Sequence, residues 1–407
     1  MRNFSLILLI AGFQAVSGQE NKDPLVFENE TTKIKIGGFV QGQMASDFNG
    51  AINNHDFVVS SLRVPENWQH QNRLAFDGSV SRISLSATHK TNKIGDIKLF
   101  IETDFRSTGN AAGLNLLRLR HAYVSVLGFT AGQTWTFMYD SDAMAPTIDV
   151  PGVNSRSFHR TPLIGYTYQF GKKFSAGVSF EMPEARITAS SITQDGTTRN
   201  ILVASDYQTI PDIPAFVQFK SSKFHVKLAG VFRNINYAHN LDINTLEGIE
   251  KIKRKQGYGG QISCSIKPVS AFTIYANGIY GKGIARYIND LRTGSFDLLY
   301  ELTSPDNIDA PTMYSYSVGI RADISKKVYL STNFSIAELE KNKKFIDDTD
   351  NLTSRYYKHG KYFSGTIWWK VYGNLLFATE YLYGYRENMN SDSGKANRLQ
   401  AMIRYNF

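Results

Sequence analysis

The sequence RLQAMIRYNF, residues 398–407, alternates between two kinds of side chain. Every second residue from Leu399 to Tyr405 is apolar or aromatic, and Arg398 and Arg404 stand among the residues between them. Successive side chains of a β-strand point to opposite faces, so this stretch predicts a strand with one apolar and one polar face. A surface strand of a soluble sandwich has the same pattern. The class of sheet therefore depends on the rest of the chain.

Residues 1–18 have the features of a secretory signal peptide. Arg2 precedes an apolar stretch at 4–13, and small residues follow at 16–18. We expect cleavage near Gly18, which directs the chain to the bacterial envelope or out of the cell. Residues 19–32 then form a short N-terminal segment.

The composition of the 407-residue chain argues against several classes of protein. A single cysteine, Cys264, excludes an internal disulfide framework. After the signal peptide, no apolar run reaches the length of a transmembrane helix. Charged residues make up only 20%, yet there are 22 Tyr and 26 Phe, and outer-membrane barrels place such aromatic residues at the two lipid–water interfaces. No linker divides residues 33–407, which we expect to form one unit.

Sixteen segments with period-two alternation fill this unit. They begin at Lys33, Arg73, Gly95, Leu116, Phe129, His159, Phe174, Pro214, Phe224, Gln256, Ala271, Met313, Lys327, Tyr357, Asn374 and Lys395. Short turns, such as 221–222, alternate strictly with long links, such as 138–158. Bacterial outer-membrane barrels have this layout, whereas sandwiches and propellers mix their loop lengths. We predict an all-β, transmembrane, antiparallel up-and-down barrel of about 16 strands in the bacterial outer membrane, with short periplasmic turns and long extracellular loops.

The polar faces of these strands carry more basic than acidic side chains. A charge that faces lipid at mid-bilayer costs roughly 2–4 kcal/mol, so these faces are expected to line an aqueous bore. The predicted pore-lining and solute-binding residues are Arg82, Lys98, Arg106, Arg118, Arg120, Arg321, Arg398 and Arg404. Because guanidinium groups bind carboxylates in a bidentate manner, they predict passive diffusion of small anionic solutes. Two alternatives stay open: a general porin, whose inserted loop balances the basic wall with acids, and a phosphate- or sugar-selective porin.

The third long link, 138–158, is the predicted constriction loop, because in several sixteen-stranded porins the third external loop folds into the pore. Its candidate residues are Tyr139, Asp140, Asp142, Asp149 and Arg156. The three aspartates are expected either to face the arginines across the channel or to bind a divalent cation, although their spacing is not that of an EF-hand. We predict no resident metal and no cofactor.

The segment RLRHAYVSVLGFTAGQTWTFMYDSDAMAPTIDVPG, which begins at Arg118, resembles the DcaP-like family of trimeric outer-membrane porins, as do RTPLIGYTYQF and SFEMPEA after it. The similarity is strongest over about residues 95–185. The resemblance implies a sixteen-stranded barrel, a homotrimer, uptake of small anions such as dicarboxylates, and a constriction near Arg118, Arg120 and the loop from Met138. Some members carry a long helical N-terminal extension, for which only about fifteen residues are available here.

Other functions have weaker support in the sequence. No HExxH, CxxC or P-loop occurs, and no Ser elbow accompanies a His, so we predict no enzyme. His121 shares its alternation with Leu117 and Leu119, which places it on the outer face. The basic run at 251–255 is expected to be a solvated loop or a contact for lipopolysaccharide phosphates. We expect no nucleic-acid binding, while an adhesin or receptor that uses the long loops stays as an alternative.

Overall fold

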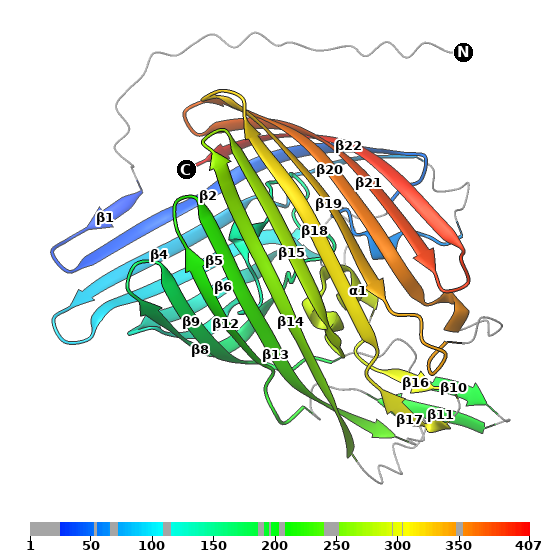
Figure 1. Cartoon of the computed structure of the whole chain (residues 1–407). Coiled ribbons are helices and arrows are strands. Elements are labelled where there is room, and N and C mark those ends of the chain that lie inside the picture. Colours follow the sequence, from blue (N-terminus) through cyan, green and yellow to red (C-terminus); the bar gives the residue numbers. More distant parts are fainter. Residues whose placement is uncertain are drawn as a thin grey trace, which may run out of the picture.

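The computed structural model shows one large barrel of antiparallel strands (Figure 1). Among the helices it describes, none has the length and apolar character needed to cross a lipid bilayer. The predicted signal peptide and residues 19–24 lie outside the described part of the chain. The described residues are 25–52, 55–65, 72–108, 115–185, 191–194, 197–202, 208–239, 252–294, 296–302, 304–346 and 353–407.

Seventeen strands occupy sixteen positions in the barrel wall, because β3 and β4 both pair with β2 and form one interrupted strand. The wall strands are β2 (Thr32–Phe48), β3 (Arg73–Asp77), β4 (Arg82–Thr91), β5 (Gly95–Thr108), β6 (Asn115–Val126), β7 (Phe129–Trp135), β8 (Arg160–Phe170), β9 (Phe174–Glu181), β12 (Ile213–Lys220), β13 (Phe224–His239), β14 (Ile252–Val269), β15 (Phe272–Lys282), β18 (Thr312–Asp323), β19 (Val328–Leu339), β20 (Tyr357–Tyr372), β21 (Leu375–Asn388) and β22 (Ser393–Asn406). These positions confirm the sixteen predicted segments.

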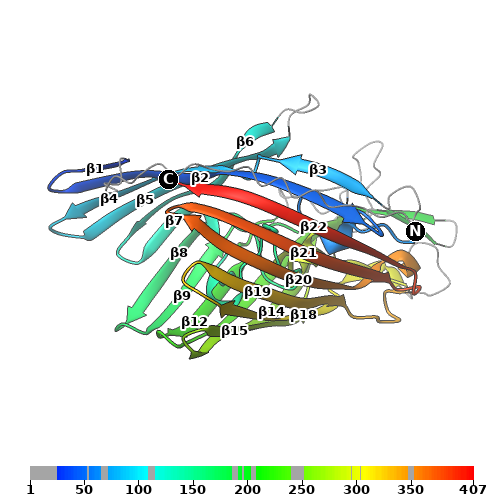
Figure 2. The same ribbon diagram turned by 90° about the horizontal axis from the view of Figure 1, so that it is seen from above.

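The barrel closes where the last strand meets the first (Figure 2). Phe39 of β2 is paired with Asn406 of β22 on one side and with Arg82 of β4 on the other. Closure joins the first and last strands, so neither is left as a long open edge of the sheet. The C-terminal Phe407 completes the seam, because its backbone N–H donates to Gly38 O at 3.1 Å.

The outer face of the wall is apolar, as the alternation predicts. Leu99, Ile101 and Ile403 are about half exposed in the isolated chain. Exposed aromatic side chains lie near the short turns: Tyr168, Phe170, Phe174, Phe272, Trp369, Tyr372 and Tyr405. This arrangement matches the aromatic belt of an outer-membrane barrel, in which rings sit at the lipid–water interface.

A β-bulge in β6 reverses one predicted orientation. Glu102 of β5 is paired with His121, but the next residue, Thr103, is paired with Leu119, so Arg120 is an extra residue in β6. One extra residue moves every later side chain to the opposite face. His121 therefore points into the barrel, where its Nδ1 lies 3.1 Å from Thr134 Oγ1. The prediction that His121 lies on the outer face was wrong.

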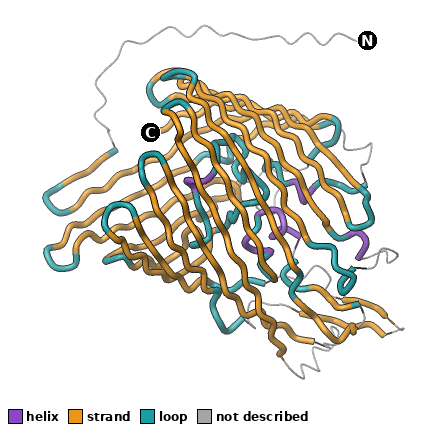
Figure 3. Tube along the Cα trace, in the orientation of Figure 1, coloured by secondary structure: helices purple, strands orange, loops and turns teal. Residues whose placement is uncertain are grey.

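Three long links enter the barrel and pack on its inner wall (Figure 3). The first contains η1 (Val59–Ser61), the second η3 (Ser141–Ala143), and the third η5 (Ala285–Tyr287) and α1 (Asn289–Gly294). Phe57 of the first link is buried with Tyr362 and Leu382 of the wall. Ile148 of the second packs on Trp368 and Met402. The inner face thus combines polar residues with apolar anchoring points, whereas alternation alone predicted a polar bore.

The remaining elements are short and lie outside the closed ring. They are β1 (Val26–Glu28), which pairs with the start of β2, the hairpin β10 (Ser191–Gln194) and β11 (Thr197–Leu202), the pair β16 (Leu299–Glu301) and β17 (Ser304–Asp309), and η6 (Thr353–Arg355).

Candidate pore and constriction loop

Residues 136–159 form a loop that leaves the wall after β7 and returns at β8. On the far side of the barrel the loop is held through its carbonyl groups. Ser331 Oγ donates to Pro146 O at 2.6 Å, and Asn333 Nδ2 donates to Ala145 O at 3.2 Å. Both donors belong to β19, so the loop crosses the interior from one wall to another.

The first limb of this loop lies against β12, β13 and β14. Asp140 Oδ2 is 2.8 Å from His225 Nε2 and accepts a hydrogen bond from Ser263 Oγ at 2.5 Å. Burial raises the pKa of Asp140, but these hydrogen bonds outweigh burial and hold the pKa below its ordinary value. Asp142 Oδ2 forms a salt bridge of 2.5 Å with Lys220 Nζ. Lys227 Nζ donates to the carbonyl of Tyr139 at 2.7 Å.

This limb places Asp140, Asp142 and His225 close enough for a metal ion, with one ligand atom of each within 4.8 Å of the others. Two lysines already supply positive charge there, so the geometry favours ion pairing over a cation site. Ser263 and His225 both bind the same oxygen of Asp140, which is not the arrangement of a nucleophile and its general base.

Asp149 lies apart from these residues and is almost fully buried. Its carboxyl group accepts a hydrogen bond from Phe57 N at 3.0 Å and from the Tyr362 hydroxyl at 3.2 Å. Burial, together with the nearby acids Asp56 and Glu380, raises the pKa of Asp149 to about 8. The three aspartates therefore contact serine, lysine, histidine, tyrosine and backbone groups, and among the described residues none of the three has an arginine at salt-bridge distance.

An aromatic cluster surrounds Arg156 at the second limb of the loop. Its guanidinium carbon is 4.2 Å from the centre of the Phe158 ring and 5.8 Å from that of Tyr139. Tyr139 in turn stacks on Trp135, with the ring centres 4.1 Å apart. Cation–π contacts of this kind hold a guanidinium group in place without neutralising it.

Several predicted wall arginines are neutralised by acids. Arg398 makes two hydrogen bonds to Asp47, at 2.5 and 3.0 Å, with both side chains about 1% exposed. Arg321 binds Asp323 at 2.7 Å. Arg106 forms salt bridges with Asp56 and Asp77. These pairs contribute little net charge to the bore. The alternation of the sequence showed that the arginines face inward but did not show their acidic partners.

Other arginines form a group with surplus positive charge, in which Asp104 and Glu102 are the acids that pair with them. Arg118 and Arg120 bind Asp104 at 2.7 and 2.9 Å. Arg120 also binds Glu102 at 2.6 Å, and Arg82 lies 3.6 Å from the same carboxylate. We call Arg82, Arg118, Arg120, Arg160 and Arg404 the arginine cluster.

Arg404 and Arg160 complete this cluster without an acid at salt-bridge distance among the described residues. Arg404 Nε donates to Gln41 Oε1 at 2.7 Å. Arg160 lies over the Trp135 ring at 4.5 Å and within electrostatic range of Arg82, Arg118 and Arg120. Sequence reasoning missed Arg160, which is the first residue of β8. The predicted Lys98 is exposed and lies on β5, between Thr88 and Ser125 of the neighbouring strands.

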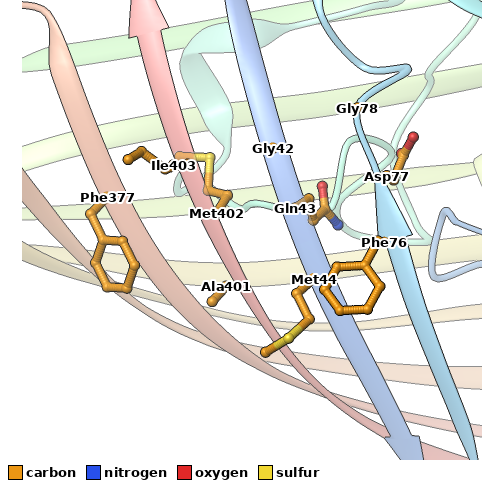
Figure 4. Close-up of a pocket in the computed structure, with 10 residues that line it drawn as sticks. All are labelled: Gly42, Gln43, Met44, Phe76, Asp77, Gly78, Phe377, Ala401, Met402 and Ile403. Carbon is orange, nitrogen blue, oxygen red and sulfur yellow. The ribbon is translucent and has the colours of Figure 1, made fainter. Parts of the chain in front are cut away.

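A hollow of about 550 Å³ lies elsewhere, on the outer face of the wall (Figure 4). Met44, Phe76 and Ile403 border it, and Gly42 and Ala401 leave room for it because their side chains are small. An apolar hollow on this face belongs to the lipid- or protein-facing surface and not to the bore.

The comparison with protein families decides the identity of this barrel. The model of the family "DcaP outer membrane protein" matches residues 16–407. The chain belongs to the DcaP outer membrane protein family. It is therefore a protein of the bacterial outer membrane and has the channel architecture of porins, as the sequence resemblance predicted.

Solved structures agree on the fold of this DcaP family member. The outer membrane channel DcaP of Acinetobacter baumannii is 19% identical, with a TM-score of 0.76 over 94% of this chain and 99% of that one. The trimer form of OmpT from Vibrio cholerae is 12% identical, with a TM-score of 0.56 over 93% and 100%. An anion-selective porin from Comamonas acidovorans is also 12% identical, with a TM-score of 0.55 over 92% and 100%. No curated protein sequence matches the chain.

Proposed function

We propose that this protein is a porin through which small anions, of the dicarboxylate class, diffuse passively. One observation carries the proposal: Arg82, Arg118 and Arg120 share only two acids, Glu102 and Asp104. The cluster also contains Arg160, on the Trp135 ring, and Arg404, on Gln41, and among the described residues neither has an acid at salt-bridge distance. Such a surplus attracts anions and repels cations, and the low-dielectric wall of a channel concentrates its field. Arginine stays charged at every physiological pH, so the preference persists.

The direct test is the reversal potential of the purified protein in a planar bilayer under a salt gradient. We expect anions to be preferred, and a clear cation preference would overturn the proposal. The double variant Arg118→Gln/Arg120→Gln is expected to slow a dianion more than a neutral sugar in liposome swelling. A matched control is Arg254→Gln, since this arginine binds Asn236 on β13 and lies outside the cluster. Equal slowing of both solutes would show that Arg118 and Arg120 set the width of the pore and not its charge preference.

A general porin is the second candidate, and the acid-paired arginines favour it. Arg106, Arg321 and Arg398 each have a carboxylate partner, so much of the basic wall is balanced. Swelling rates for neutral, monoanionic and dianionic solutes separate the candidates. In a general porin the swelling rate depends on solute size alone. In a phosphate- or sugar-selective porin, one class of solute permeates faster than other solutes of the same size.

We also propose that three copies assemble, because one arc of the outer wall is poor in interfacial aromatic side chains. In the half of β2, β4, β5 and β6 near the short turns, most outward positions are aliphatic. The exceptions are Thr32, His89 and Thr91 at the rim, and one aromatic side chain, Phe27 of β1, is paired with Ile34 there. The aliphatic residues are Ile34, Ile36, Leu85, Ala87, Ile97, Leu99, Val124 and Val126. A hollow of about 370 Å³ lies on the same arc. A surface poor in interfacial aromatics suits contact with protein, whereas the remaining arc suits lipid.

Spin labels test where the copies meet. In a Cys264→Ser background, a nitroxide at Leu99→Cys is expected to be immobile and shielded from oxygen. The matched label at Val217→Cys, which lies beside the aromatic belt, is expected to be accessible to oxygen. Equal accessibility of the two labels would refute the proposed surface, and a monomer on an unheated gel would refute the assembly itself. In this assembly the aromatic arc would contact lipid. The basic run near Lys255 would bind lipopolysaccharide phosphates, and Lys255 itself pairs with Asp309 at 3.7 Å.

A further inference from the structure

Glu380 is a buried acid near the middle of β21 that contacts the loop across the barrel. Its Oε2 accepts a hydrogen bond from Ile148 N, and its Oε1 accepts one from Asp149 N, both at 2.9 Å. Thr366 Oγ1 donates to Oε2 at 2.6 Å, and Gln400 Nε2 donates to Oε1 at 2.7 Å. The residue is 1% exposed, and all four donors are uncharged.

These hydrogen bonds differ in kind from those that β19 makes with the neighbouring residues of the loop. Ser331 and Asn333 bind carbonyl groups of the loop through neutral donors. Glu380 instead binds two successive N–H groups through an acceptor that carries a full charge, and hydrogen bonds to a charged group are about twice as strong as neutral ones. A buried carboxylate also depends on its donors, because losing them leaves an unsolvated charge.

We propose that Glu380 is the residue that positions the constriction loop and so fixes the width of the bore. Thr366 and Gln400 hold the carboxylate from the two neighbouring strands, β20 and β22. The carboxylate in turn fixes the loop at 148–149, about midway between the limbs near Asp140 and Arg156. The inference rests on the proposed function, since a position in the loop matters for transport only if solutes pass beside it.

The variant Glu380→Gln tests the proposal with almost no change in side-chain size. It replaces one acceptor by an NH2 group, which faces a backbone donor and repels it. We expect the loop to loosen, so that swelling rates for neutral sugars near the size limit rise several-fold and single-channel current becomes noisier. Charge in the bore has little effect on the size limit for neutral solutes, so this readout separates position from electrostatics.

The matched control exchanges two neighbours, because Glu380 and Gln400 are paired across β21 and β22. The variant Glu380→Gln/Gln400→Glu keeps the composition and net charge but moves the carboxylate away from the loop. We expect it to stay as permeable to large sugars as Glu380→Gln. A return to the wild-type size limit would overturn the proposal, because charge alone would then explain the first variant.

Two further measurements keep the outcome interpretable. Mobility on unheated gels shows whether each variant folds, and Thr366→Val, which removes a single donor, is expected to loosen the loop less than Glu380→Gln. A spin-label distance between residue 145 and the wall reports the loop position without any transport. An unchanged distance in Glu380→Gln would overturn the positioning role, whereas a changed distance with no effect on any solute would count against the proposed function.

Discussion

The guanidinium carbon of Arg404 lies 4.2 Å from the centre of the Phe39 ring. Arg82, on the other side of β2, approaches the same ring at 5.1 Å. A single aromatic side chain on β2 thus contacts two like charges, one on each neighbouring strand, β22 and β4. Cation–π contact stabilises each guanidinium group by about 0.5–2 kcal/mol and leaves its charge free to act on solutes.

Arg404 is therefore expected to contribute directly to anion preference. Arg404→Gln should lower the ratio of anion to cation permeability, measured from reversal potentials in a planar bilayer. The control is Lys395→Gln, which removes the same charge from an exposed position on the same strand. If both variants change the ratio equally, the total charge of the barrel decides selectivity and the cluster has no special role.

The Asp47–Arg398 pair is expected to act on stability. Removing one partner of a buried ion pair leaves the other charge unpaired, at a cost of about 3–5 kcal/mol. Arg398→Gln should therefore lower the temperature at which the folded band disappears on gels. The double variant Asp47→Asn/Arg398→Gln should recover much of the loss, and additive losses would contradict the coupling between the two residues.

The raised pKa of Asp149 leads us to expect that the constriction loop is less stable at alkaline pH. Its pKa rises to about 8 in the folded protein from an ordinary value of 3.8, so the folded state holds a proton that the unfolded state releases. This contribution to stability is complete below about pH 4 and is lost as the pH rises toward 8. We expect the loop to fluctuate more at pH 9 than at pH 6, seen as current noise. Asp149→Asn, which stays neutral, should remove that difference, and a persistent difference would assign the effect to another group.

Gly38 is expected to be essential for closing the barrel. Its φ is +151°, and a Cβ there would lie 2.2 Å from Arg82 O, next to the Phe407 ring. Gly38→Ala should cost about 1–3 kcal/mol and lower the yield of folded barrel. Gly42→Ala on the same strand is the control, because its Cβ would meet Ile403 at an ordinary 3.8 Å. Similar yields from the two variants would contradict this account.

The sequence predicted the wall more fully than the site. Period-two alternation found every position in the barrel because burial against lipid acts on each strand separately. The alternation did not reveal the bulge at Arg120, because a bulge changes the pattern only slightly. The outward apolar residues have odd numbers up to Leu119 and even numbers from Ala122 and Val124 onward. Ion pairs such as Asp47–Arg398 join residues far apart in the chain, so the alternation that placed Arg398 on the inner face did not reveal its partner. Arg160 was missed because it stands where the strand begins and the loop ends.

The three inward links hold one another as well as the wall, since Phe57 binds Asp149 and Ser60 N binds Asp290 Oδ1 at 2.8 Å. The molecule thus has two parts: an outer wall that meets the bilayer, and a set of inward links that controls passage. The outer face of the wall must stay apolar throughout because it meets the bilayer. Selection for particular solutes acts on a few residues of the inward links and the inner wall. Evolution can therefore change which solutes pass by replacing those few residues, without altering the outer face of the barrel.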